Sequence, residues 1–322
     1  MRHRFRFKVG VALGGGAARG LAHVGVLRAL ERAEIPIDIV VGTSIGSILG
    51  GAYSAIGDCA ALESKVRSVL TSDGFRKNRL GFLRETRRER GGVFFSVANL
   101  VRRGIFFGVS NLRASFLSAE EFASSMAAVL PDVSIEDLPI VFGAVALDIR
   151  SAEEVVLRTG SLRRAAAASA AIPGILPPVR MNGRTLIDGG WVDKIPVLPA
   201  FHLGADVVIA VDITAELSAA RDFRRGVDIM VRANSIKDSV LVGHSLRMAD
   251  VVIEPDVGDV HWADFSAFER CMKAGDEAAT QVVPRIRELL RHERLFSIVR
   301  PGPGRKLAEL NVQSGGHGFR VE

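Results

Sequence analysis

The sequence predicts an α/β protein built around a mostly parallel sheet. The first fifty residues follow the order strand, glycine loop, helix, strand, which is the order of a βαβ unit. Short apolar strand segments then recur along the chain, separated by helical patterns. Hydrophobic residues make up 48% and charged residues 24% of the 322 residues, a usual balance for a chain with a sizeable core. The length suits one large domain or two ordinary ones.

The βαβ unit begins with a predicted strand over residues 7–13, which ends at three consecutive glycines. A helix is predicted over 19–33, because apolar residues recur there every three positions and form one broad face (Leu21, Val24, Leu27 and Leu30). A second strand is predicted over 35–41 and leads into Gly42.

Regular α/β alternation resumes after residue 118. A helix is predicted over 161–173, where Pro173 stops it, and one or two closing helices over 266–294. The glycine-rich polar stretch from Pro301 is expected to be loose. Strands are predicted over 138–147, 153–160, 184–190, 205–213 and 247–257.

Residues 74–118 differ in composition from the rest of the chain. From Arg76 to Arg103 there are nine Arg or Lys against two Glu, with phenylalanines among and just after them. We interpret the segment as an insertion into the α/β core that contacts an anionic membrane, since apolar rings can sit at the interface while guanidinium groups meet headgroups. A solvated connection with a charged face is the alternative.

The overall charge also bears on partners and location. A net charge of +6 and a pI near 9.8 favour contact with an anionic surface. The 6% aromatic content argues against a nucleic-acid partner, because single strands stack on exposed rings. No signal peptide is apparent, so we expect a cytoplasmic protein, peripheral to the inner face of the membrane. The two cysteines predict neither a disulfide framework nor a zinc site.

One stretch of 19 residues, from Ile39 to Gly57, carries no charged side chain. Its length would cross a hydrocarbon core of about 30 Å as a helix. Five glycines and four Ser or Thr residues oppose this interpretation, because a membrane span needs sustained large apolar side chains.

The alternative places Ser44 in a G-x-S-x-G motif between a predicted strand and a predicted helix over 44–56. A reactive serine needs a sharp strand-to-helix turn, and Gly42 and Gly46 relieve the crowding that such a turn creates. The following helix N-terminus presents N–H groups to an oxyanion. A glycine-rich packing turn would give the same pattern, because G-x-S-x-G often arises by chance.

The earlier glycine loop, residues 14–16, can direct successive N–H groups at one anion. A dinucleotide pyrophosphate is one candidate, with Asp38 as the ribose acid, although Arg19 stands where the fingerprint requires glycine. A tetrahedral acyl oxyanion is the other. Neighbouring parallel strands end at the same sheet edge, so the last two N–H groups of the loop are expected to face Ser44. Arg19 would then add positive charge or anchor the loop.

A reactive serine also needs a proton acceptor. His244 and His261 are candidates if the site follows a Ser, Asp, His order. Asp188 closes a predicted strand and precedes Gly189 and Gly190, so its carboxylate can sit on a tight turn and act directly as a base. The spacing alone favours an ordinary Asp-Gly-Gly turn.

Together, GGGAARG (14–20), GTSIG (42–46) and DGG (188–190) resemble the ordered motifs of the patatin-like phospholipase family. The bacterial branch related to neuropathy target esterase is the most similar. Two flanking stretches, ARGLAHVGVLRAL and ASAAIPGILPPV, are also similar to the family's, and the resemblance covers roughly residues 7–290. It implies a three-layer α/β/α fold, with a single domain over 1–295 that carries the 74–118 insertion and a tail over 296–322.

The same resemblance implies a site and an activity. Ser44 would be the nucleophile and Asp188 the base of a Ser-Asp dyad, without a metal or other cofactor. The oxyanion hole would be Gly14, Gly15 and Gly16, and the supporting residues would be Arg19, Gly42, Gly46, Gly189 and Gly190. The expected function is hydrolysis of acyl esters of lipids, with a phospholipid or lysophospholipid as substrate. The alternative is a non-catalytic nucleotide- or lipid-binding α/β protein.

Overall fold

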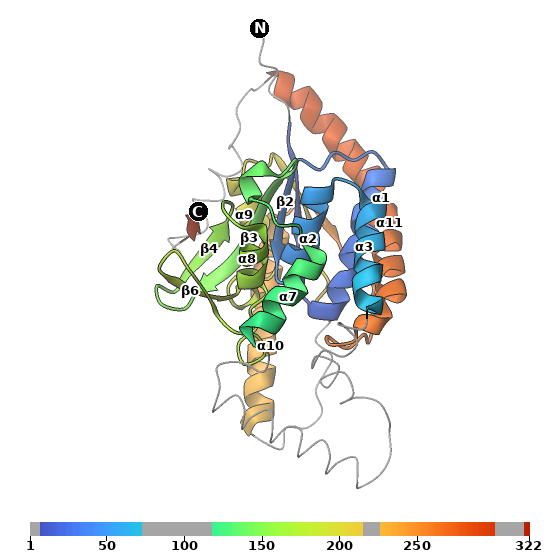
Figure 1. Ribbon diagram of the computed structural model, residues 1–322. Coiled ribbons are helices and arrows are strands. Elements are labelled where there is room, and N and C mark those ends of the chain that lie inside the picture. The colour runs from blue at the N-terminus through green and yellow to red at the C-terminus, as the bar shows by residue number, and fades with distance from the viewer. Residues whose placement is uncertain (1–6, 73–117, 215–225, 300–318) are drawn as a thin grey trace.

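The core of the fold is a sheet in which five strands run parallel in the order β3-β2-β1-β7-β8. The computed structural model describes residues 7–72, 118–214, 226–299 and 319–322 (Figure 1). The parallel strands are β1 (Val9–Leu13), β2 (Ile39–Thr43), β3 (Val141–Asp148), β7 (Val207–Val211) and β8 (Val251–Ile253). These strands confirm the predicted α/β class.

Antiparallel strands extend the sheet on the β3 side. Both β4 (Glu153–Leu157) and β6 (Arg184–Asp188) pair with β3, and β5 (Val179–Met181) pairs with β6. Strand β9 (Phe319–Val321) lies parallel to β4. The sheet is therefore mostly parallel, with its antiparallel strands gathered at one side.

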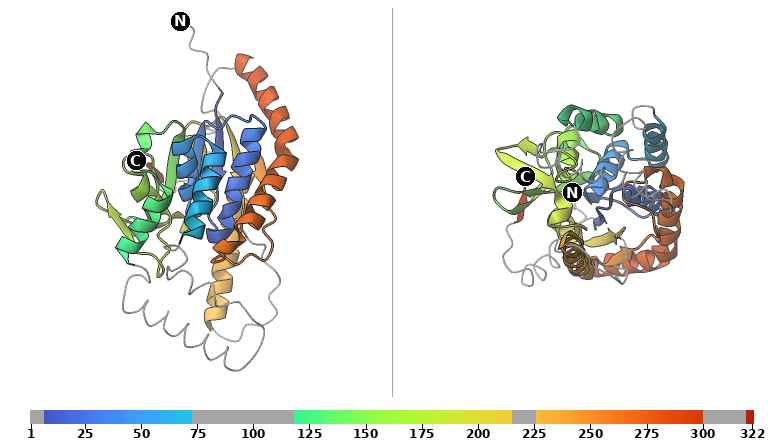
Figure 2. Two further views of the ribbon diagram at one scale, coloured as in Figure 1. Left: turned by 45° about the vertical axis from the view of Figure 1, so that its right-hand side comes forward. Right: turned by 90° about the horizontal axis from the view of Figure 1, so that it is seen from below.

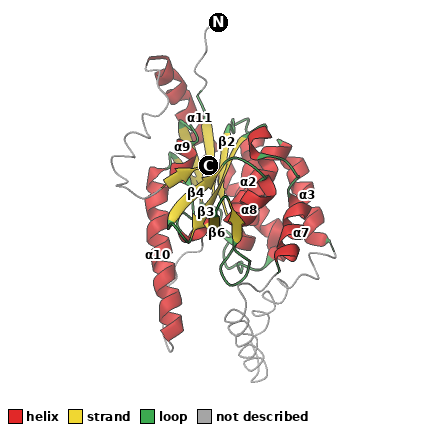
Figure 3. Ribbon diagram, turned by 60° about the vertical axis from the view of Figure 1, so that its left-hand side comes forward, coloured by secondary structure: helices red, strands yellow, loops and turns green. Residues whose placement is uncertain are grey.

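Helices cover both faces of the sheet, which gives the three layers that the sequence predicted (Figure 3). Along β1, Val9, Val11 and Leu13 point into one buried cluster, while Ala12 points into the other. The first cluster is covered by α1 (Ala22–Arg32), α2 (Ile45–Ile56), α3 (Cys59–Thr71), α7 (Ala119–Val129), α8 (Leu162–Ser169) and α11 (Phe268–Val299). The second is covered by α9 (Val197–His202) and the last turns of α10 (Gly226–Met248).

Helices α1 and α11 pack with their backbones almost touching (Figure 2). A Cβ added at Gly25 would lie 1.8 Å from the Met272 carbonyl oxygen, and one at Gly275 would lie 2.0 Å from the Ala22 carbonyl oxygen. Only glycine permits this approach, so the long last helix is fixed against the first βαβ unit.

The closing segment, predicted as one or two helices, is the single helix α11. Two other features differ from the sequence predictions. The helix predicted over 19–33 begins as a 3-10 turn (Ala17–Leu21) before α1. The end of the chain, expected to be loose, forms β9, and the Glu322 carboxylate lies 2.6 Å from the Arg184 guanidinium. The strand edge of β4 binds these last residues and orders them.

Two other predictions concern membranes. The basic insertion predicted at 74–118 falls outside the described residues, except for its last position. None of the helices in the described ranges has both the length and the apolar composition needed to cross a membrane. The charge-free stretch from Ile39 to Gly57 instead forms β2 and α2 within the core.

Candidate active site

Ser44 lies at a sharp turn between the end of β2 and the start of α2. Its backbone angles are φ 56° and ψ −122°, a combination that residues with a side chain rarely adopt. The helix begins at once, because the N–H groups of Ser47 and Ile48 donate to the Ser44 carbonyl at 2.9 and 3.2 Å. The turn therefore holds the Ser44 hydroxyl at the carboxyl edge of the sheet, the geometry that the G-x-S-x-G pattern predicts.

The two glycines of the motif are packing requirements of this turn. A Cβ at Gly42 would lie 2.3 Å from the carbonyl carbon of Gly46, and a Cβ at Gly46 would lie 2.1 Å from the carbonyl oxygen of Leu13. In both cases the obstacle is backbone, which cannot rotate away. Any larger residue would push α2 away from β1 and β2.

Strand register brings Asp188 to Ser44 across 144 residues of chain. On one edge of β3, Thr43 of β2 is opposite Val145, and Asp188 of β6 is opposite the next residue, Ala146. Because β2 runs parallel and β6 antiparallel to β3, their carboxyl ends meet head-on. The residue after Thr43 therefore faces the last residue of β6.

The Ser44 hydroxyl donates to Oδ2 of Asp188 at 2.6 Å. The other carboxylate oxygen, Oδ1, accepts the Gly190 N–H at 2.7 Å, so the turn after β6 fixes the carboxylate. A Cβ at Gly189 would lie 2.3 Å from the Val145 carbonyl oxygen, which explains a glycine there. Each acceptor oxygen of Asp188 is thus occupied, and Oδ2 faces the serine.

Burial raises the pKa of Asp188 to about 6, against an ordinary value of 3.8. Hydrogen bonds from Ser44 and Gly190 and the positive charge of Lys194 oppose this shift but do not cancel it. Asp188 is 5% exposed. Its carboxyl group is therefore mostly ionised at neutral pH, yet it is a stronger base than a solvated aspartate.

The glycine loop runs beside the serine, where a Cβ at Gly15 would lie 3.4 Å from that of Ser44. The Gly14 N–H donates to the Val211 carbonyl at 3.2 Å, and the Gly15 N–H donates to the Lys194 carbonyl at 2.9 Å. The predicted role of these two glycines as oxyanion donors is therefore corrected, because both N–H groups are engaged by backbone.

The next two residues of the loop differ from them. Within the described ranges, the N–H groups of Gly16 and Ala17 donate to no protein acceptor. Ala17 has a positive φ of 50° and lines the same pocket as Ser44. Among the described residues, this part of the loop therefore has donors without a protein acceptor, and Ala17 brings it to the pocket that Ser44 lines.

Two side chains hold the loop in place. Nε2 of His23 lies 2.8 Å from the Gly14 carbonyl oxygen, and because a carbonyl only accepts, Nε2 carries the hydrogen. Burial lowers the pKa of His23 to about 4, so the ring is neutral at physiological pH. The Arg19 side chain donates through Nε to the Val260 carbonyl at 2.8 Å, which anchors the start of the helix.

The two histidines considered as bases have other contacts. Nδ1 of His244 lies 2.8 Å from the Arg247 guanidinium, on α10. His261 packs against the Trp262 ring with 5.5 Å between ring centroids. Among the described residues, no three or more His, Cys, Asp or Glu side chains gather in a way that could hold a metal ion.

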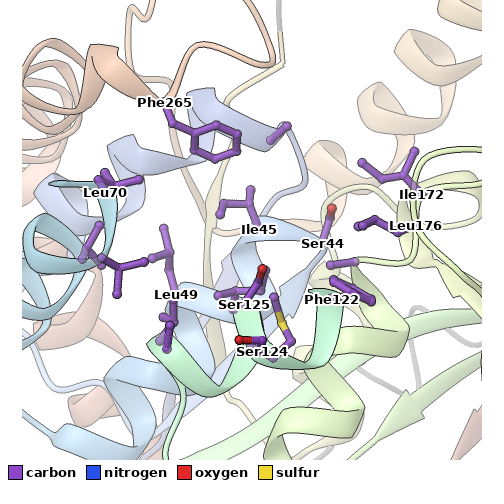
Figure 4. A pocket seen from close by; sticks show the side chains of 18 of the residues that line it. Ser44, Ile45, Leu49, Leu70, Phe122, Ser124, Ser125, Ile172, Leu176 and Phe265 are labelled. Atoms are coloured by element: carbon purple, nitrogen blue, oxygen red, sulfur yellow. The ribbon is translucent and has the colours of Figure 1, made fainter. Parts of the chain in front are cut away.

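A pocket of about 650 Å³ opens beside Ser44 (Figure 4). Its walls come from α2, α3, α7 and residues 170–176, and apolar side chains dominate them. Leu49, Leu70, Phe122, Met126 and Leu176 are among these side chains. The volume is typical of a site for a small molecule, and the lining favours an apolar one.

Sequence reasoning missed Ser169, whose Oγ accepts the Ser44 N–H at 3.0 Å. It also gave His23 no part in holding the glycine loop. Ser169 ends an alanine-rich helix, where a serine is unremarkable, and nothing in the local sequence indicates that α8 ends beside β2. Such contacts depend on tertiary packing.

The chain is similar to known proteins at the level of sequence. A family model described as patatin-like phospholipase matches residues 11–201, more than half of the chain. The chain is 34% identical over 207 residues to patatin-like phospholipase domain-containing protein ZK370.4 of Caenorhabditis elegans, covering 64% of this chain and 13% of that protein. It is also 34% identical over 205 residues to lysophospholipase nte1 of Emericella nidulans, covering 64% and 12%.

The chain thus matches about an eighth of the length of these relatives. Among solved structures, VipD from Legionella pneumophila matches with a TM-score of 0.41 and 14% identity, over 87% of this chain and 67% of that chain.

Proposed function

The chain belongs to the patatin-like phospholipase family, and we propose that it is a serine hydrolase that cleaves acyl esters of lipids. The observation that carries the proposal is the 2.6 Å hydrogen bond from the Ser44 hydroxyl to Asp188 at the edge of an apolar pocket. A nucleophile bonded to a base of raised pKa, beside a cavity suited to a hydrocarbon chain, matches the needs of ester hydrolysis.

In the acylation step, Asp188 takes the proton of the Ser44 hydroxyl as Oγ attacks the ester carbonyl carbon. The carbonyl oxygen becomes an oxyanion, and we assign its stabilisation to the free N–H groups of Gly16 and Ala17. The tetrahedral intermediate collapses by breaking the bond to the alcohol oxygen, which receives the proton from Asp188. An acyl group remains on Ser44.

Deacylation uses the same groups in reverse. Asp188 removes a proton from a water molecule, whose oxygen attacks the acyl carbon. The second intermediate releases the fatty acid, and Asp188 returns the proton to Oγ. Since the same carboxyl group must act first as a base and then as an acid, a pKa near 6 suits both tasks better than 3.8.

The substrate class follows from the pocket and the relatives. We assign the apolar cavity to the acyl chain and the part of it beside Ser44 to the ester. The similar fungal protein carries the name lysophospholipase, which favours lysophospholipid or phospholipid as the substrate here. We also propose that the chain lies in the bacterial branch of the family, as its motifs suggested.

The test is labelling with a fluorophosphonate probe, followed by hydrolysis assays on lysophosphatidylcholine and diacyl phospholipid. Wild type should label and Ser44→Ala should not. Ser54→Ala is the matched control, because Ser54 is a buried serine on the same helix and should label normally. Equal labelling of wild type and Ser44→Ala would refute the nucleophile. Loss of activity in His244→Ala or His261→Ala would indicate a triad instead of the dyad.

A further inference from the structure

Helix α10 is too long for the sheet on which it packs. It has 23 residues, or about 34 Å at 1.5 Å per residue. The adjacent strand β7 has five residues, or about 17 Å at 3.3 Å per residue. The carboxyl end of α10 connects directly to β8, so the excess length lies at its amino end.

That amino end projects past the carboxyl edge of the parallel strands, the edge that carries Ser44 (Figure 1). Only the last turns of the helix pack on the sheet, where Val242 is buried and Leu246 and Met248 are partly buried against the same cluster. The projecting turns have no such cover among the described residues.

One stripe of the projecting helix is apolar and exposed. Ile229 and Met230 are 55% and 73% exposed, and Ile236, Val240 and Leu241 follow at spacings that place them along one side. Val242, which faces the core, lies on the opposite side of the helix wheel. Large apolar side chains gathered in this way on a solvent-exposed surface indicate an interaction site.

The charge on the stripe is cationic. Lys237 lies within it, whereas the acidic residues of the helix, Asp228 and Asp238, lie outside it by helical spacing. The Lys237 ammonium also lies 3.7 Å from the Asp238 carboxylate at the border of the stripe. The Lys237 ammonium lies 5.6 Å from the ring centre of Trp191, which is itself 44% exposed. Trp191 is three residues after Asp188, so the stripe reaches the loop that carries the base.

We propose that this stripe of α10, together with Trp191, docks on an anionic lipid surface and brings the pocket to its substrate. The inference rests on the proposed function for the nature of that surface. An apolar face with a lysine and an indole at its border is suited to a membrane interface, where rings and methyl groups enter the acyl boundary and the ammonium meets headgroups.

A second copy of the chain fits the stripe less well. A symmetric dimer brings the same patch of both partners together, so Lys237 of each copy would meet a stripe that carries a cation and no carboxylate. The charge pattern therefore favours a surface that is itself negative.

The experiment measures flotation with vesicles of phosphatidylcholine, with and without phosphatidylglycerol. The parent carries Ser44→Ala, so that binding is measured without turnover. Adding Ile229→Ser and Ile236→Ser should weaken binding to the anionic vesicles by roughly tenfold or more, because two half-exposed isoleucines no longer enter the lipid. Val133→Ser with Val141→Ser is the matched control, since both are exposed valines away from α10.

Binding should also fall with salt and with Lys237→Gln, and unchanged melting temperatures would show that the variants fold. Equal flotation of the isoleucine variant and its parent would overturn the inference. So would a change from dimer to monomer with vesicle binding unaffected, which would assign the stripe to a second copy.

The two proposals fail in distinguishable ways. With Ser44 intact, the isoleucine variant should hydrolyse a short, water-soluble ester at the wild-type rate and lose activity only on vesicles. If no protein hydrolyses any ester, the proposed function fails, whereas the flotation result still decides the docking surface.

Discussion

The replacement Asp188→Asn separates the catalytic role proposed for the carboxylate from its cost to stability. Asparagine keeps the shape of the side chain, and its oxygen can still accept the Gly190 N–H. Its amide nitrogen, however, donates to the Ser44 hydroxyl instead of accepting from it. With the base removed, we expect kcat to fall by about 10²–10⁴-fold.

The stability effect follows from the raised pKa. The pKa of Asp188 is about 6 in the folded state and 3.8 in the ordinary solvated state, a difference of about 2. At about 1.36 kcal/mol for each pKa unit, this difference lowers the free energy of unfolding by about 3 kcal/mol. The folded state binds the proton more tightly than the unfolded state, so wild type loses stability as the pH rises from 3.8 to 6. Above this window the penalty is complete, and below it the penalty is absent. The asparagine variant carries no such penalty.

The assay is thermal unfolding of both proteins at pH 4 and pH 8. All other titrating groups are shared, so they largely cancel in the difference between the two melting temperatures. Between pH 4 and pH 8, the melting temperature of Asp188→Asn should rise by roughly 4 °C relative to that of wild type. In wild type, kcat/KM should fall as the pH drops below about 6.

Asp148→Asn is the matched control with the opposite sign. Burial acts to raise the pKa of Asp148, but hydrogen bonds from backbone N–H groups, Ser151 and Arg184 hold it below its usual value. Its carboxylate therefore stabilises the fold above the ordinary pKa, and its loss should destabilise the protein at pH 8. A melting difference for Asp188→Asn that does not change with pH would refute the reasoning.

Three further predictions test the packing at the site and at the far end of β6. Gly46→Ala should lower the melting temperature and abolish activity, because its Cβ meets backbone at 2.1 Å, whereas Gly226→Ala, with nothing within 4 Å, should do neither. Met126→Trp should fill part of the pocket and so shift the ratio of p-nitrophenyl butyrate to p-nitrophenyl palmitate hydrolysis toward the short chain. An unchanged ratio would show that the pocket does not hold the acyl chain. Glu322→Ala should lower the free energy of unfolding in urea by about 1–2 kcal/mol, because it removes a partner of Arg184. An unaltered midpoint would show that this contact at the end of β9 does not stabilise the fold.

The parts of the site that sequence could predict are those fixed by near neighbours in the chain. The turn at Ser44 needs glycine two residues before and two after, so the motif itself carries the geometry. The strands and glycine loop of the first βαβ unit were predicted for the same reason. Parallel pairing then places the loop and the serine at one edge of the sheet.

The pairing of Ser44 with Asp188 could not be predicted from spacing. It depends on β6 joining β3 at the residue after the one that faces Thr43, and nothing in the sequence DGG specifies that register. Only the resemblance to a family pointed to it. The engaged N–H groups of Gly14 and Gly15 were missed likewise, because their acceptors come from Val211 and the segment after β6.

The strength of Asp188 as the proposed base depends on where β6 places its positive charge, Arg184. Asp188 and Arg184 lie on the same strand, but four residues apart, or about 13 Å along an extended chain. Arg184 is bound by Asp148, Glu153 and Glu322 at the far end of the strand. A guanidinium beside Asp188 would hold its pKa low, as Arg184 helps to do for Asp148. By keeping that cation away, the fold leaves burial as the dominant influence on Asp188, and a buried aspartate can then serve as the base without a histidine.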